Sequence, residues 1–295
     1  MDFGSDADRL LGSERFLPVC RAQSLRYGGN TPCLEIDAGE AVILIDAGTG
    51  IRAAGQALVE RGVKEIHLLL SHAHWDHIQG FPYFAPLHQP GTCIRVYSLR
   101  RPGTALDTIF ADQQRHSFFP VALDQQAARL EFVELDEGQV VEIGDTRVYS
   151  RRLNHPSVTG GFRLERQGRT FAYLSDVDLY TKLLLGEGLQ TPSAAERQQR
   201  LEGLLAGVCE LAHGADLAVC DTFFRPEDYE PSWGHSRPED ALRLARDTGI
   251  GQVVLFHHEP HRSDGEIDEL LAHYRRQAGP GLEVFAAAEG LALSL

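Results

Sequence analysis

The sequence predicts a mixed α/β fold organised as a single domain over residues 1–295. Short apolar runs typical of buried strands recur along the chain, and amphipathic segments typical of helices separate them. Strands come first and helices follow, repeatedly, which is the pattern of one mixed α/β domain. No internal repeat and no low-complexity linker divides the 295 residues, which suffice to bury a substantial core.

Composition narrows the function classes. The net charge of −14 comes from 42 acidic and 28 basic residues. This balance argues against broad electrostatic binding to nucleic acid or to an anionic membrane, although an acidic chain can still carry a local basic patch. We expect no membrane association, since no apolar stretch approaches the roughly 20 residues that span a bilayer. The acidic N-terminus has no apolar signal core. A reducing, cytoplasmic location is predicted from five scattered, unpaired cysteines: Cys20, Cys33, Cys93, Cys209 and Cys220.

The first elements follow from local patterns. Residues 1–18 carry little periodicity and are expected to form an N-terminal arm. Strands at 33–37 and 41–46 are predicted from their apolar content and the Ala-Gly-Glu turn between them. The glycine-rich residues 46–50 end the second strand and lead into an amphipathic helix at 51–61.

The middle of the chain continues this alternation. An apolar run predicts a strand at 65–70, and residues 75–84 are expected to be helical until Pro82 and Pro86 interrupt the pattern. Further strands are expected around a polar helix and loop at 105–126, over residues 92–98, 130–135 and 140–148.

The second half is predicted to form the second sheet and its helices. Residues 181–214 are polar and helix-prone and are expected to be a helical insertion, with Pro192 and Ser193 placed as at a helix start. Strands are predicted at 147–153, 161–166, 170–175, 216–220, 252–256 and 282–286. Helices are predicted at 238–248 and 264–277.

The segment after the 65–70 strand is the most informative part of the chain. It reads H-x-H-x-D-H and places four metal-capable side chains within one short loop: His72, His74, Asp76 and His77. Neutral imidazole and carboxylate groups suit zinc and its first-row neighbours. A polar surface loop is the alternative, and three histidines with an aspartate at this spacing argue against it.

Three later residues also close apolar strands, where a scaffold can present them to a common edge. They are His155, Asp176 and His257. Any one of them alone would be better explained as a hydrogen-bonded packing residue. Two neighbours, His258 and Asp178, compete with His257 and Asp176 for the same role.

Together these residues resemble the signature of the metallo-β-lactamase superfamily. The resemblance implies an αββα sandwich, with two mixed β-sheets flanked by helices and a metal site at one edge. It also implies two divalent metal ions, most simply Zn²⁺, with Mn²⁺ or Fe²⁺ as alternatives. The implied ligands are His72, His74 and His155 for the first metal, Asp76, His77 and His257 for the second, and Asp176 for both. Asp46 resembles the family's early aspartate, which supports the site, although a turn aspartate fits equally well.

The branch of the superfamily follows from further residues. His74 stands where oxygen- and nitric-oxide-reducing diiron members carry glutamate, and Asp176 fills a bridging position that β-lactamase-type members lack. Asp221 and the pair His235-Ser236 resemble a segment of ribonuclease Z-like phosphodiesterases, in which an acidic residue orients a histidine that acts as general acid. The chain differs from the ribonuclease Z pattern at Asp221, where that family has glutamate. The aspartate side chain is one methylene shorter, so its contact with His235 is the point to check.

The function implied is a dinuclear metal-dependent hydrolase. We expect a phosphodiesterase in which a hydroxide bridging the metals attacks phosphorus, Asp76 helps to hold it, and His235 protonates the leaving group. A small, cyclic phosphodiester is the preferred substrate and tRNA an unlikely one, because the chain is acidic and has no basic excursion. The resemblance makes a homodimer a reasonable expectation. Two alternatives stay open: a lactone or thioester hydrolase, and a non-catalytic metal-containing ligand-binding or sensor protein.

Aromatic residues near the predicted loops have two interpretations. They could form a lid around a base or sugar, or they could belong to the core. The set comprises Phe81, Tyr83, Phe84, Phe118, Phe119 and Trp233.

Overall fold

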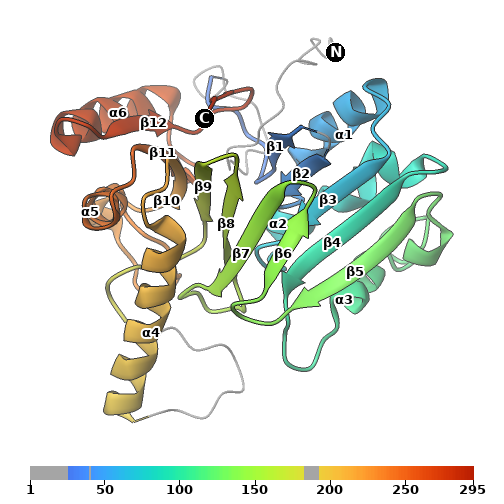
Figure 1. The fold of residues 1–295 in the computed structure, drawn as a ribbon, viewed down its shortest axis with the longest axis horizontal. Coiled ribbons are helices and arrows are strands. Elements are labelled where there is room, and N and C mark those ends of the chain that lie inside the picture. Colours follow the sequence, from blue (N-terminus) through green and yellow to red (C-terminus); the bar gives the residue numbers. More distant parts are fainter. Residues whose placement is uncertain (1–25, 40, 183–192) are drawn as a thin grey trace.

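Two β-sheets face each other in the computed structural model, which describes residues 26–39, 41–182 and 193–295. Figure 1 shows α4, α5 and α6 on the outer side of one sheet and α1 and α3 on the outer side of the other. The four layers are therefore helix, sheet, sheet and helix, as predicted. The arm expected over residues 1–18 and the helix start at Pro192 lie outside the described residues.

The first sheet has the strand order β1-β2-β3-β4-β5. Its first two strands form an antiparallel pair, and β2 to β5 run parallel to one another. The strands are β1 (Leu34–Ala38), β2 (Ala41–Ile45), β3 (Glu65–Leu69), β4 (Cys93–Leu99) and β5 (Arg129–Leu135).

The second sheet has the order β12-β11-β10-β9-β8-β7-β6. Strands β6 to β9 form an antiparallel meander, whereas β9 to β12 are parallel. The strands are β6 (Val140–Ile143), β7 (Thr146–Arg152), β8 (Gly160–Arg166), β9 (Arg169–Leu174), β10 (Leu217–Asp221), β11 (Gln252–Phe256) and β12 (Glu283–Ala286).

Helices cover both outer faces. The α-helices are α1 (Ile51–Glu60), α2 (Trp75–Ile78), α3 (Leu106–Gln113), α4 (Ala194–Ala212), α5 (Pro238–Thr248) and α6 (Asp264–Ala278). Short 3-10 turns occur at η2 (Phe81–Tyr83), η3 (Ala85–His88), η4 (Leu123–Gln125) and η5 (Pro226–Asp228). Ser193 accepts a hydrogen bond from the Glu196 amide and so caps α4, the described part of the predicted insertion, which packs on β7 and β8.

The buried apolar side chains fall into three main layers. One lies between the two sheets and includes Ile43, Phe162 and Tyr173. The second joins α4, α5 and α6 to the seven-stranded sheet, and the third joins α1, α3 and the turns after α2 to the other sheet. Burial on both faces makes each sheet a rigid platform for the loops at its edge.

Two predicted elements differ from the structure. The single strand expected over 140–148 is a hairpin, because Gly144, with φ of 58°, permits a tight turn between β6 and β7. The helix expected over 75–84 ends at Ile78, and two proline-containing 3-10 turns follow. Among the described residues, no helix is both long and apolar enough to cross a membrane. The four described cysteines form no disulfide.

Candidate metal centre

The predicted histidines and aspartates meet at one edge of the two sheets. Strands β9, β10 and β11 are adjacent and parallel, so their carboxyl ends lie at the same edge. Asp176 follows β9, Asp221 ends β10 and His257 follows β11, while the H-x-H-x-D-H loop follows β3 and His155 follows β7. We call seven of these residues the metal cluster: His72, His74, Asp76, His77, His155, Asp176 and His257.

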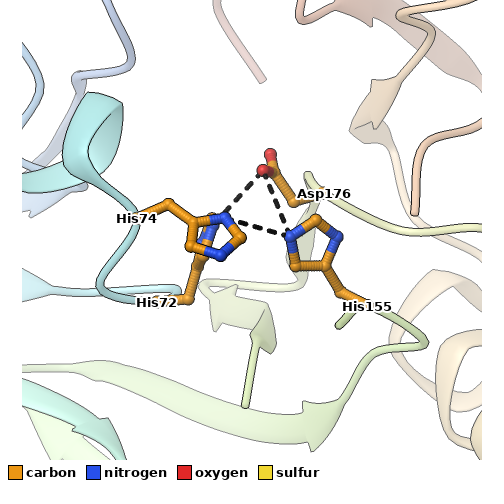
Figure 2. A group of neighbouring side chains, drawn as sticks. All are labelled: His72, His74, His155 and Asp176. Atoms are coloured by element: carbon orange, nitrogen blue, oxygen red, sulfur yellow. Dashed lines mark hydrogen bonds and ion pairs between the residues drawn. The ribbon is translucent and has the colours of Figure 1, made fainter. Parts of the chain in front are cut away.

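One oxygen of Asp176 faces the first predicted ligand set (Figure 2). Its Oδ2 atom lies 3.3 Å from Nε2 of His72 and 3.9 Å from Nε2 of His155. Nδ1 of His74 lies 3.2 Å from Nε2 of His155. These four side chains bring one donor atom each within 4.8 Å of the others, a spacing that suits a single metal ion.

The other oxygen of Asp176 faces the second set. Its Oδ1 atom lies 3.0 Å from Nδ1 of His257 and 3.3 Å from Nε2 of His77, which in turn lies 3.1 Å from Oδ2 of Asp76. Asp176 therefore stands between two groups of donors, with one carboxylate oxygen directed to each. This is the geometry expected of a bridging ligand.

Backbone strain is concentrated at this edge. Among the described non-glycine residues, φ is positive at only four, and three of them are Asp46 (62°), Asp176 (59°) and His257 (63°). Asp46 and His257 directly follow a strand, and one residue separates Asp176 from the end of β9. A left-handed backbone is costly for residues other than glycine and persists where surrounding structure imposes it, often at functional sites. At Asp176 and His257 it aims the side chains at the cluster.

Asp46 supports the cluster from behind rather than capping a turn. Its buried carboxylate accepts hydrogen bonds from the backbone N–H and hydroxyl of Ser71, at 2.7 and 2.9 Å, and from the Tyr173 hydroxyl at 2.7 Å. Nδ1 of His77 lies 2.9 Å from the same carboxylate. A carboxylate on one ring nitrogen directs the other nitrogen toward a metal.

Tyr173 and Ser71 were not singled out from the sequence. A signal for Tyr173 did exist, because a tyrosine in the apolar second half of a strand needs a partner for its hydroxyl.

Burial and charge prepare the histidines to bind a cation. Burial lowers the pKa of His72 well below its usual range and that of His155 to about 4, so both rings are neutral and keep a lone pair for a metal. Burial also opposes the charge on His77, but the carboxylates of Asp176 and Asp76 outweigh it and raise the pKa of that ring. Nε2 of His72 is buried and makes no hydrogen bond within the described residues. This donor set fits divalent first-row metals.

The pair Asp221 and His235 adjoins the cluster. Oδ2 of Asp221 lies 2.8 Å from Nδ1 of His235, so the shorter aspartate reaches the ring. Backbone N–H groups of Val177 and Phe223 donate to the two Asp221 oxygens, at 3.0 and 3.1 Å, and fix the carboxylate. The His235 ring centroid lies 4.5 Å from that of His257. His235 therefore stands beside the second ligand set with its orientation fixed by Asp221.

The two competing residues point elsewhere. Nε2 of His258 lies 3.0 Å from the carbonyl oxygen of Ala287. Asp178 accepts hydrogen bonds from the hydroxyls of Tyr229 and Thr181. The aromatic set splits, because Phe81 and Phe84 are fully buried in the core whereas Tyr83, Phe118 and Trp233 are exposed.

Comparisons with known proteins identify the family to which the chain is similar. A family profile described as "Beta-lactamase superfamily domain" matches residues 42–195. Ribonuclease Z of Archaeoglobus fulgidus is 22% identical over 285 residues, which cover 86% of each chain. Ribonuclease Z of Streptomyces avermitilis is 26% identical and covers 77% of this chain and 80% of its own.

Solved structures show the same fold. The metallo-beta-lactamase fold protein YhfI from Bacillus subtilis superposes with a TM-score of 0.66 at 15% identity, over 97% of this chain and 98% of its own. The short form of human tRNase Z gives a TM-score of 0.61 at 18% identity and covers 96% of both chains. The predicted αββα sandwich is confirmed.

These relatives contradict one prediction. A small phosphodiester was preferred and tRNA considered unlikely, yet the matched relatives are ribonucleases and one structural neighbour is a tRNase Z. The net charge of −14 misled the prediction because it sums the whole chain. Charges act on a bound polyanion only within about one Debye length, roughly 8 Å at physiological salt.

Proposed function

The chain belongs to the metallo-β-lactamase superfamily and is a metal-dependent hydrolase, and from that premise we propose that it hydrolyses phosphodiester bonds, with RNA as its substrate class. The match of the family profile to residues 42–195 and the ribonuclease Z relatives support this proposal. So does the arrangement of the metal cluster beside a carboxylate-oriented histidine.

We propose that His72, His74 and His155 hold one metal ion, that Asp76, His77 and His257 hold a second, and that Asp176 contacts both. Zinc is the first choice because mixed imidazole and carboxylate ligands suit it. When bound, two such ions supply Lewis-acid stabilisation to the oxygens of a phosphodiester. Asp46, through its contact with Nδ1 of His77, would keep that ring in the orientation that binding needs.

The single observation that carries the proposal is the buried Asp221–His235 pair. A departing alkoxide needs a proton, and a histidine whose Nδ1 faces a carboxylate can deliver one from Nε2. The pair lies at the second ligand set, where a leaving group would depart. Asp76, whose side chain is 18% exposed, would help to position the attacking water. Thioester hydrolysis has less use for such an acid, because its leaving group is a stable thiolate. A lactone also releases an alkoxide, so a substrate panel is needed to decide between lactone and phosphodiester.

The test is hydrolysis of bis(p-nitrophenyl) phosphate by protein reconstituted separately with zinc and with manganese. A panel of single-stranded RNA, a cyclic nucleotide, a lactone and a thioester is assayed in parallel. We expect turnover of the phosphodiesters, abolished in Asp176→Ala, and RNA cleavage under the same conditions. Turnover of the lactone or thioester alone, in protein that holds two metals, would contradict the proposal.

A further inference from the structure

The chain contains two tryptophans, Trp75 and Trp233, and both are unusually exposed. Trp75 is 60% exposed and Trp233 is 57% exposed, whereas tryptophan is on average a highly buried residue. Leaving a large apolar ring in water costs free energy unless the ring has a ligand. Both tryptophans also lie within two residues of a site residue in the sequence, so their exposure concerns the site.

The two tryptophans belong to segments that meet across the metal cluster. Trp75 lies between His74 and Asp76 at the start of α2. Trp233 is followed by Gly234, whose carbonyl oxygen lies 3.0 Å from Nδ1 of His155. Nε2 of the same ring lies 3.2 Å from Nδ1 of His74. One imidazole ring therefore links the two segments, with a tryptophan next to each end of the link.

The cluster opens to solvent where these segments meet. Of the four residues in Figure 2, His74 is exposed and the other three are buried. The Asp76 side chain is 18% exposed and that of His235 is 11% exposed. Solvent therefore reaches the site at His74 and Asp76, and only slightly at His235. Trp75 adjoins His74 and Asp76 in the sequence, and Trp233 precedes His235 by two residues, so the backbone of each tryptophan borders these groups.

One side of the Trp233 indole packs against two buried phenylalanines. Its ring lies 6.1 Å from that of Phe223 and 5.9 Å from that of Phe224, centroid to centroid, and both phenylalanines are buried. The Phe223 ring in turn stacks on His235, at 5.0 Å and an interplanar angle of 25°. The indole is therefore held in place on one side and open on the rest of its surface.

The backbone of Trp75 is held by hydrogen bonds although its indole ring is exposed to solvent. Its carbonyl oxygen accepts a hydrogen bond from the Gln79 amide, and the same short helix buries His77 and Ile78. The carbonyl of His77 accepts from the Ala47 amide, which ties α2 to the end of β2. Because the backbone is fixed, an exposed ring at this position does not reflect a loose chain end.

We propose that Trp75 and Trp233 are stacking platforms for nucleobases on either side of the phosphodiester held at the metal cluster. The inference rests on the proposed function and specifies how that site recognises its substrate. Every nucleobase has a π-face, so stacking on an indole binds single-stranded RNA with little sequence preference. Stacking also does not require a positive surface, which suits an acidic chain.

The test uses intrinsic fluorescence, because each single variant leaves one tryptophan as the reporter. Trp75→Leu and Trp233→Leu keep an apolar side chain and remove the aromatic face, whereas Trp75→Phe and Trp233→Phe keep an aromatic face as matched controls. The purified metal-loaded chain is titrated with a single-stranded RNA hexamer carrying hydrolysis-resistant phosphorothioate linkages, and with an abasic hexamer of the same backbone.

We expect saturable quenching by the RNA and little by the abasic strand. Each leucine variant should raise Kd by roughly 5- to 100-fold, and each phenylalanine variant by much less. Wild-type Kd in both leucine variants, or equal quenching by the abasic strand, would overturn the proposal. So would emission that varies with protein concentration and not with RNA, since that result indicates contact with a second copy.

The measurements distinguish failure of base stacking from failure of the proposed function. Wild-type protein that hydrolyses bis(p-nitrophenyl) phosphate but shows no base-dependent quenching would overturn base stacking alone. Base-dependent quenching in protein that hydrolyses no phosphodiester would support base stacking and overturn the proposed function.

Discussion

Nδ1 of His235 lies 2.8 Å from Oδ2 of Asp221, and both side chains are almost completely buried. Asp221 ends β10, so its position is set by a strand paired on both sides, and two backbone N–H groups hold its oxygens. A ring oriented in this way by a strand end is ready to act on a substrate without reorganisation.

Removing the charge of Asp221 should impair the chemical step. In Asp221→Asn the amide keeps the shape of the carboxylate but can present its NH2 group to Nδ1 of His235, so the ring is no longer held in the orientation that lets Nε2 donate. We expect kcat for an RNA phosphodiester to fall by about 10²- to 10⁴-fold. The matched control is Asp216→Asn, just before the opposite end of β10, where the carboxylate pairs with Arg169. Steady-state kinetics should show near wild-type kcat for the control, and equal losses in both variants would refute this role of Asp221.

Metal content should follow the two ligand groups around Asp176. We expect two metal ions per wild-type chain by elemental analysis, about one in His155→Ala, and fewer in Asp176→Ala because both oxygens of that carboxylate are lost. His67→Ala is the control, since His67 lies on the same strand that precedes the H-x-H-x-D-H loop but faces Tyr97, at 3.0 Å. Two metals in His155→Ala, or loss of metal in His67→Ala, would be inconsistent with the proposed ligands.

The Tyr173 hydroxyl should matter through Asp46. Tyr173→Phe removes one of the hydrogen bonds to that buried carboxylate, which also contacts His77. We expect the free energy of unfolding to fall by about 1–3 kcal/mol and metal affinity to fall roughly 10- to 100-fold. Chemical denaturation and a metal-chelator competition measure these quantities. Tyr149→Phe, which removes a hydroxyl that donates to Glu165, should leave metal affinity unchanged.

Glu266 should make stability depend on pH. Hydrogen bonds from the backbone and side chain of Ser263, and from Arg225, lower the pKa of Glu266 to about 2. A lowered pKa in the folded state stabilises above the unfolded value of about 4.3 and loses that contribution as pH falls toward 2. Glu266→Gln should therefore unfold more easily than wild type at pH 6, by about 0.5–1 kcal/mol after allowance for exposure. The difference should shrink between pH 4.5 and 3, and a constant difference would argue against this origin.

Much of the fold was predictable because its signals are local. Helix α5 spans Pro238–Thr248 as predicted, since a proline stands at its first position and Gly249 ends it with φ of 78°. The hairpin at Gly144 was missed because strand-forming residues continue on both sides of the turn. The stretch does carry a local turn signal, because the pair Gly144-Asp145 between two strand-like runs is typical of a two-residue hairpin loop.

The site was predictable where one loop carries it and less so where distant segments meet. The H-x-H-x-D-H loop can be recognised from the sequence alone. The choice between His257 and His258 depends on the left-handed backbone at His257, which the tertiary structure at this sheet edge imposes. The role of Asp46 depends on Tyr173, which is 127 positions away. Net charge likewise could not report the local surroundings of a bound polyanion.

The most direct test of the account compares two leaving groups in His235→Ala. A dinucleotide releases an alkoxide that needs a proton, whereas the p-nitrophenyl ester of the same nucleotide releases a stable aryl oxide. We predict that kcat falls by about 10²- to 10⁴-fold for the dinucleotide and by roughly tenfold or less for the aryl ester. Equal losses on both substrates, in protein that retains its metals, would contradict the assignment of His235 as the acid and with it the central claim.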